Sequence, residues 1–275
     1  MKKFLILLSD NLVNSWRTKK GILFLVIYTA VFLLCAYAII DMIHTVESQM
    51  EMMGIPEAQK QFVTEFGRLI VINSIRNEVI NYLMSIPFIN IPLSLVSLFG
   101  TPLLILLLKY DVISQENYEH TARFLLFRCK RLQIYLAKYL SSVIEIMILT
   151  FTALFIALIW AAFSVENFSF AESFKAGLHL FIVSQLMFSA ITAIVQLVSV
   201  AVKKPVTGLL ISAAALIFLL IIPVWVSWVS PFDINYTGGL FAGKSTPLLV
   251  SIAGYLGFNL LFLSAGFLIY RRKNI

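Results

Sequence analysis

Six long apolar runs constrain this chain more than any other feature of its sequence. A helix needs about 20 consecutive apolar residues to cross a bilayer, and each run meets that length. The runs are continuous rather than alternating, which indicates helices and not the strands of a barrel. A chain that is 60% hydrophobic and 13% charged has the composition of an integral membrane protein. The predicted spans are 21–40, 86–108, 140–162, 178–202, 206–229 and 248–270.

The lysines and arginines set the predicted orientation. If the N-terminus lies inside, the inner segments hold 16 of the 21 basic residues and the outer segments hold 5. Such an excess is typical of cytoplasmic segments. We therefore predict a multi-pass protein of a bacterial cytoplasmic membrane with both termini in the cytosol. The net charge of +7 fits contact with anionic lipid. It is spread over four short segments, which argues against a nucleic-acid surface.

Two segments outside the spans are predicted to be helical. Residues 1–20 place Phe4, Leu8, Leu12 and Trp16 at helical spacing among polar residues, as in a helix that lies in the membrane interface. Residues 41–85 form a long extracytoplasmic insertion that Gly54 and a following proline divide, which predicts two amphipathic helices. Its methionines and one histidine favour an adaptable apolar face over a soft-metal site, so no metal site is predicted.

The cytoplasmic segment 109–138 is the longest polar island between apolar runs. It carries charges of both signs, yet Phe124 and Phe127 are too apolar for a solvated linker. These two residues and Arg131 fall at i, i+3 and i+7, on one face of a helix. We predict a short amphipathic helix that presents this face to a cytosolic partner. The alternative is a charged loop that anchors at lipid head groups.

A phosphate-loop pattern, G-x-x-x-x-G-K-[ST], occurs at residues 238–245. Such a loop cradles phosphate when a strand precedes it and a cytosolic helix follows it. Here a predicted span precedes it, and the predicted topology places it outside the cell. We therefore interpret the match as coincidence, and we predict that the chain has no nucleotide site and is not itself an enzyme.

The cytoplasmic segment resembles the first cytoplasmic loop of ABC-2-type transporter permeases. That loop reads, loosely, I-x-x-E-x-x-x-G-T-x-x-x-L-L, followed by a proline-containing turn, an arginine, and a lysine that leads into the third span. The chain departs from it at His120, where the family has glycine, and at residues 128–130, which lack the proline. The matching residues are Ile113, Glu116, Thr121, Leu125, Leu126, Arg131, Ala137 and Lys138.

This resemblance implies a fold and a mechanism. The fold would be an all-α, six-span ABC-2 (type V exporter-like) transmembrane domain with an N-terminal interfacial helix, a coupling helix in 109–138 and a re-entrant segment at 230–247. Two permeases, identical or related, would pair, and each would dock a separate ABC ATPase subunit that holds the ATP and Mg²⁺; no cofactor binds this chain. The docking residues would be Glu116, Glu119, Thr121, Arg123, Phe124, Phe127, Arg128 and Arg131.

Polar side chains within the spans are candidates for the transport pathway or its gate, because they are costly in lipid. The three candidates for the pathway or gate are Glu145, Gln196 and Asn259. A carboxylate at the depth of Glu145 favours a basic or hydroxyl partner. For the amides the alternative is hydrogen bonding between helices, and Ala253 with Gly257 forms a small-residue pair suited to close helix packing.

The sequence as a whole predicts export of an amphipathic molecule, such as a peptide, an antibiotic-like compound or a lipid. The spans carry few charges, and 23 phenylalanines suit a lining for an apolar cargo. A secondary transporter is the first alternative, although no internal repeat or pair of broken spans is found. A membrane-embedded enzyme is the second, although no nucleophile–base or metal-ligand spacing occurs in the spans.

Overall fold

The protein is described by a computed structural model that covers residues 2–17, 19–53, 96, 100–118, 129–164, 169–222, 230 and 245–273. All regular structure in these residues is helical, as predicted. The helices are α1 (Lys2–Arg17), α2 (Lys20–Met53), α6 (Thr101–Lys109), α7 (Ser114–Tyr118), α9 (Arg131–Ser164), α10 (Phe170–Ala201), α11 (Pro205–Ile221) and α13 (Ser245–Arg272).

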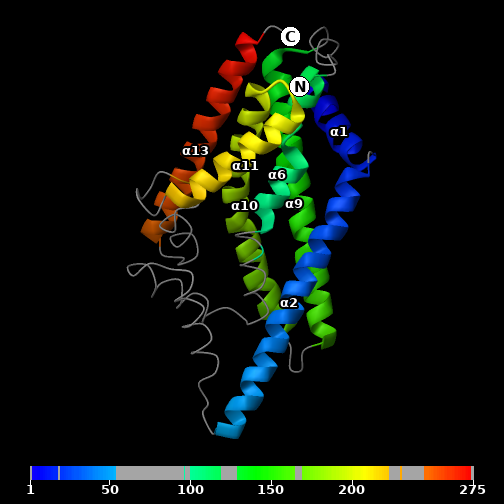
Figure 1. Ribbon diagram of the computed structural model, residues 1–275, viewed down its shortest axis with the longest axis vertical. Helices are drawn as coiled ribbons and strands as arrows, with labels where there is room; N and C mark the ends of the chain where they lie inside the picture. Colours follow the sequence, from blue (N-terminus) through cyan, green and yellow to red (C-terminus); the bar gives the residue numbers. More distant parts are fainter. Residues whose placement is uncertain are drawn as a thin grey trace.

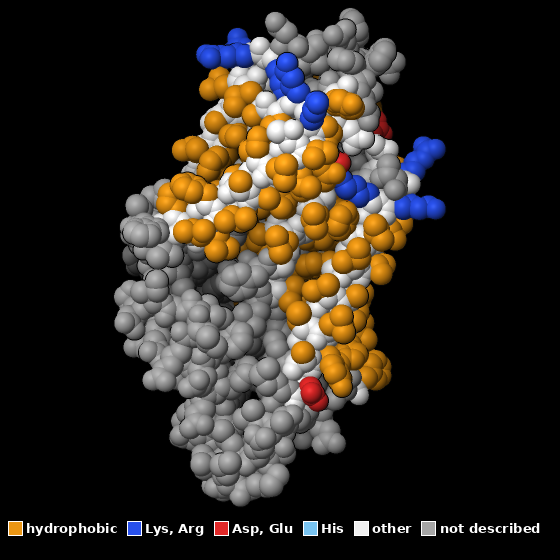
Figure 2. Space-filling view, in the orientation of Figure 1, with side chains coloured by type: hydrophobic (Ala, Val, Ile, Leu, Met, Phe, Trp, Pro, Cys, Tyr) orange, Lys and Arg blue, Asp and Glu red, His pale blue; other side chains and the backbone are white. Residues whose placement is uncertain are grey.

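The long helices form an elongated bundle with α10 at its centre (Figure 1). α10 packs most extensively against α13, and also against α9, α6 and α11. α1 and α2 also pack against α9. α1 begins and α13 ends at the same end of the bundle (Figure 1), which we call the terminal end. Lysine and arginine side chains gather there, whereas apolar side chains cover the helices below (Figure 2).

Four helices are long and apolar enough to cross a membrane, and they coincide with four of the six predicted spans. They are Lys20–Ala38, Arg131–Phe163, Phe170–Ala201 and Leu249–Arg272. α11 has 17 residues in the described part of the chain, so it covers only the first part of the predicted span 206–229. Of the predicted span 86–108, only residue 96 and residues 100–108 are described. The transmembrane character is confirmed by these long apolar helices.

α2 and α9 extend furthest beyond the predicted membrane boundaries, and α10 also begins ahead of its predicted start at residue 178, at Phe170. α2 continues without a break to Met53, directly before Gly54, so residues 41–53 prolong the first span and do not form a separate helix. α9 begins at Arg131, which makes the last part of the predicted cytoplasmic loop the first turns of this helix. α2 and α9 have 34 residues each, which makes each helix about 51 Å long. The hydrocarbon core of a bilayer is only about 30 Å thick. The remainder of the 41–85 insertion lies outside the described residues.

Small residues permit close packing in α13, but not at the predicted pair. Ala253 and Gly257 are exposed, and a Cβ atom added at Gly257 would meet nothing within 4 Å. The close approach occurs at Gly266, where a Cβ atom would collide with the Tyr135 hydroxyl and lie 3.4 Å from the Leu197 Cα. Within this chain, Ala253 and Gly257 therefore make no close helix contact, because that face of α13 is turned away from the bundle.

The predicted orientation can be tested by labelling single cysteines with a membrane-impermeant reagent, in a variant whose two native cysteines are replaced. Ser48, in the extension of α2, is predicted to lie outside, and Tyr118, which is 61% exposed at the end of α7, is predicted to lie inside. We expect Ser48→Cys to be labelled in intact cells and Tyr118→Cys only after permeabilisation. The reverse pattern would reject the orientation.

Candidate functional site

Six charged side chains meet at the terminal end of the bundle, and we call them the ion-pair network. The network consists of three lysines and three carboxylates that five segments of the chain contribute. The lysines lie beside the ends of three predicted spans, where α2 begins, where α6 ends and in the early turns of α9. The six residues are Lys20, Lys109, Asp111, Glu116, Lys138 and Glu145.

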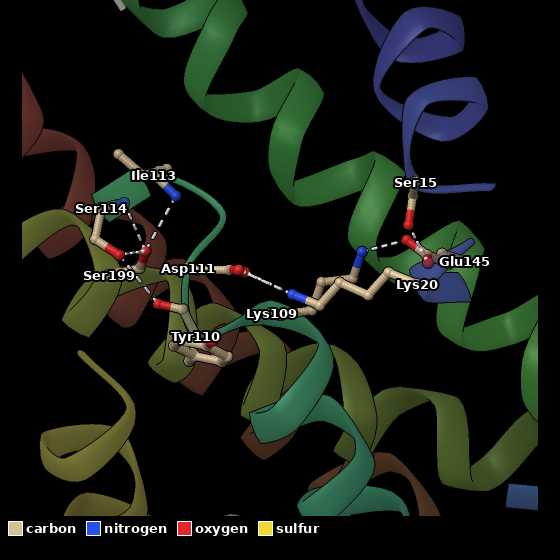
Figure 3. A network of polar contacts seen from close by, with 9 residues as sticks. All are labelled: Ser15, Lys20, Lys109, Tyr110, Asp111, Ile113, Ser114, Glu145 and Ser199. Carbon is tan, nitrogen blue, oxygen red and sulfur yellow. Dashed lines mark hydrogen bonds and ion pairs between the residues drawn. The ribbon is translucent and has the colours of Figure 1, made fainter. Parts of the chain in front are cut away.

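Glu145 is the most deeply buried member of the network. Its side chain is 1% exposed, and its carboxylate forms an ion pair with Lys109 at the end of α6. The Ser15 hydroxyl of α1 donates a second hydrogen bond to it, at 2.5 Å (Figure 3). A buried carboxylate needs such partners to offset its loss of hydration. Glu145 therefore has the basic and hydroxyl partners that its position in the sequence predicted, and it joins α1, α6 and α9.

The two other ion pairs hold the segment that follows α6. The Lys20 ammonium lies 2.9 Å from the Asp111 carboxylate and 5.2 Å from the centre of the Tyr110 ring, a distance at which a cation attracts the ring. The Lys138 ammonium lies 2.5 Å from the Glu116 carboxylate and donates to the Val112 carbonyl at 2.7 Å. These contacts attach the segment to α2 and α9.

Ser199 of α10 fixes the same segment from a third direction. Its hydroxyl oxygen accepts hydrogen bonds from the backbone N–H groups of Ile113, at 3.0 Å, and Ser114, at 3.1 Å (Figure 3). These N–H groups belong to the turn before α7 and to its first residue, where a helix leaves its donors without intrahelical partners. Gly208 of α11 completes the enclosure, because a Cβ atom there would lie 3.1 Å from the Tyr110 carbonyl oxygen. Residues 110–118, which we call the anchored segment, are thus held by α2, α9, α10 and α11.

A second group of contacts ties α13 to α9 and α10 at the terminal end. The Arg131 guanidinium donates to the carbonyls of Tyr270, Arg271 and Lys273, at 3.2, 2.8 and 2.9 Å. The Lys273 ammonium donates to the carbonyl of Val200 at 2.5 Å. Cations placed on the last carbonyls of helices compensate for the missing intrahelical donors and for the helix dipole. Partial burial lowers the pKa of Lys273, and its neighbour Lys203 lowers it further.

The two amides predicted for the pathway or gate make hydrogen bonds between helices. Asn259 accepts a bond from the Tyr139 hydroxyl at 2.7 Å and donates to the Ser189 hydroxyl at 2.9 Å, and so connects α13, α9 and α10. Gln196 donates to the Tyr135 carbonyl at 3.0 Å. In the described part of the chain, neither amide bonds to the ion-pair network. Their contacts are those expected of the structural alternative.

Of the eight predicted docking residues, the structure describes Glu116 and Arg131. Both are engaged within the chain, Glu116 by Lys138 and Arg131 by the end of α13. The other six lie outside the described residues: Glu119, Thr121, Arg123, Phe124, Phe127 and Arg128. The candidate phosphate loop also lies outside them, except for Ser245, which begins α13.

Sequence reasoning singled out Glu116, Lys138 and Glu145 but missed the other three members of the network. Lys20 and Lys109 were counted only as basic residues of inner segments, and Ser199 gave no signal because serine is common in transmembrane helices. A usable signal was the position of each lysine within two residues of a predicted span, close enough to reach an acidic partner at the same depth. Among the described residues, no group of three or more histidine, cysteine or acidic side chains is arranged to hold a metal ion.

No protein-family model matches this chain, and no curated protein matches it.

Proposed function

We propose that this chain is the transmembrane subunit of an ATP-driven exporter, with the six-span ABC-2 topology and both termini in the cytosol. A separate ABC ATPase subunit, which holds ATP and Mg²⁺, docks at the loop between α7 and α9, and two permease chains form the transport unit. The loop resemblance and the distribution of basic residues support this proposal. The chain supplies no catalytic residue.

The anchored segment is the observation that carries the proposal. It leads directly into the predicted docking loop, and α9 continues from the loop's other end. Contacts to Lys20, Lys138 and Ser199 tie this segment to three long helices. A displacement of the loop would therefore reach the spans through ion pairs and hydrogen bonds instead of being absorbed by a flexible linker, as mechanical coupling requires.

The cargo that fits this proposal is an amphipathic molecule moved outward. An apolar part partitions into the bilayer and meets a lining rich in phenylalanine, leucine and isoleucine. The predicted outer insertion carries 6 acidic against 3 basic residues, which favours a cationic cargo at the exit. A cationic peptide or an antibiotic-like compound combines an apolar part with a positive charge, whereas a lipid supplies the apolar part.

The docking step is tested by Phe124→Ala, which removes the aromatic residue predicted to enter an apolar cleft of the ATPase. Central aromatic residues of interfaces contribute about 2 kcal/mol or more to binding, so we expect the affinity for the ATPase subunit to fall about 30-fold. The affinity is measured by titrating the purified ATPase against the permease in lipid nanodiscs.

The matched control is Phe163→Ala at the opposite end of α9, where the side chain is 88% exposed; it should leave binding unchanged. Glu116→Ala is a poorer probe, because it would leave the buried Lys138 without its carboxylate. Equal ATPase binding by wild type and Phe124→Ala, with transport intact, would reject docking through this face of the loop.

A further inference from the structure

Basic side chains gather at the terminal end where α10 gives way to α11 and where α13 ends, and we call them the basic cluster. Figure 2 shows lysine and arginine side chains at both places on one face of the bundle. Lys273 joins the two places, because its ammonium donates to the carbonyls of Val200, at 2.5 Å, and Val202, at 2.9 Å. The basic cluster consists of Lys203, Lys204, Arg271, Arg272 and Lys273.

The basic cluster carries positive charge that the described part of the chain does not compensate. Its four members other than Lys273 are exposed, and their side chains form no ion pair or hydrogen bond with described residues. The three carboxylates of the ion-pair network are already engaged by the three lysines of that network. Partial burial lowers the pKa of Lys273, and Lys203 lowers it further, so these two ammonium groups repel each other. An anionic partner relieves this repulsion.

The surroundings of the basic cluster are those of a lipid head group. The cluster stands where the predicted spans 178–202, 206–229 and 248–270 end or begin, the level at which the hydrocarbon core gives way to the polar interface. α11 exposes Val206 and Leu210, which lie on one face at i and i+4, and α13 exposes Leu268. Apolar side chains adjoin the basic ones along both helices (Figure 2). A lipid contacts both kinds of surface, whereas a soluble anion contacts the basic cluster alone.

We propose that the basic cluster is a binding site for an anionic phospholipid of the membrane leaflet at the terminal end. The phosphate lies among the lysines of the turn between α10 and α11 and the arginines that end α13, and the acyl chains follow the exposed apolar faces of these helices. Basic pockets at the ends of transmembrane helices bind such head groups. A zwitterionic phospholipid brings an ammonium group beside these cations and is disfavoured. The inference holds with or without an ATPase partner.

The test is native mass spectrometry of the purified full-length protein, titrated with phosphatidylglycerol, phosphatidylethanolamine or phosphatidylcholine of identical acyl chains. We expect one saturable molecule of phosphatidylglycerol, bound at least 30-fold more tightly than either zwitterion. Soluble glycerophosphoglycerol distinguishes a free anion from a lipid, and we expect it to compete weakly because it has no acyl chains.

Lys203→Gln/Lys204→Gln is the site-directed variant. Each lysine near an anionic lipid contributes about fivefold to binding, so the double substitution should weaken phosphatidylglycerol binding about 30-fold. The two side chains are exposed and unpaired among the described residues, so thermal stability should not change. The matched control is Arg17→Gln/Lys19→Gln, which removes the same charge from exposed residues between α1 and α2, outside the basic cluster, and should leave binding unchanged.

Four results would overturn the proposal. Equal binding of the three lipids by wild type would show annular lipid without selection for an anion. An equal loss in both double variants would show attraction to the general basic surface and not to this cluster. Competition by glycerophosphoglycerol as strong as by the intact lipid would exclude a lipid as the specific ligand. Unchanged lipid binding by Lys203→Gln/Lys204→Gln, together with loss of ATPase binding, would assign the cluster to a protein partner.

Discussion

Glu145→Leu is expected to destabilise the protein by about 3–5 kcal/mol, the range for removing one partner of a buried ion pair. Lys109 is buried beside Glu145, so the substitution leaves an ammonium group without its carboxylate and also removes the acceptor of the Ser15 hydroxyl. The measurement is reversible unfolding in mild detergent micelles. Transport should fall as well, because α1, α6 and α9 lose their common contact.

The double variant Glu145→Leu/Lys109→Met separates the loss of the pair from the loss of packing. With both charges replaced by apolar side chains, no buried charge remains unpaired, and we expect the double variant to recover the stability of about 3–5 kcal/mol that is lost in Glu145→Leu alone. Purely additive effects of the two substitutions would show that the two side chains are not coupled. Wild-type stability and transport in Glu145→Leu would show that the carboxylate reaches water.

Gly266→Ala is expected to destabilise the bundle by about 1–3 kcal/mol, the usual cost of adding atoms to a filled core. The new methyl group would collide with the hydroxyl of the fully buried Tyr135. That hydroxyl has no hydrogen-bond partner among the described residues, so Tyr135→Phe should restore much of the stability lost in Gly266→Ala. Thermal unfolding of the two single variants and the double variant measures the coupling.

Gly257→Ala is the matched control on the same helix. Its Cβ atom meets nothing within 4 Å, and alanine favours a helix over glycine by about 0.5–1 kcal/mol, so this variant should be as stable as wild type or slightly more stable. Equal effects at Gly257 and Gly266 would contradict the packing of α13 against α9 and α10 described here.

The apolar helices could be predicted from the sequence because a bilayer demands long apolar runs, but their ends could not. Residues 41–53 and 131–138 contain no glycine or proline, so α2 and α9 continue through residues whose polarity indicated the aqueous phase. Hydropathy marks where lipid contact stops, whereas a helix stops where its backbone is interrupted or capped.

The contacts of the candidate site were less accessible to sequence reasoning than the helices. The basic partner of Glu145 was predicted as a type, but Lys109 lies 36 positions away, and only the packing of α6 against α9 selects it. Ser199 bonds to Ser114, which is 85 positions away in the sequence, and Gly266 lies against Tyr135 and Leu197 of two other helices. Such pairs depend on the rotation of each helix about its axis, which an almost uniformly apolar sequence specifies weakly.

The central claim is that a separate ATPase drives transport through this chain, and transport in inverted membrane vesicles tests it most directly. Vesicles that contain the permease and its proposed ATPase subunit should accumulate a cationic amphipathic peptide when ATP is supplied. Accumulation should be lost with an ATPase that cannot hydrolyse ATP, and reduced by Phe124→Ala but not by Phe163→Ala. Accumulation by the permease alone, driven by an ion gradient and indifferent to ATP, would contradict the account and identify a secondary transporter.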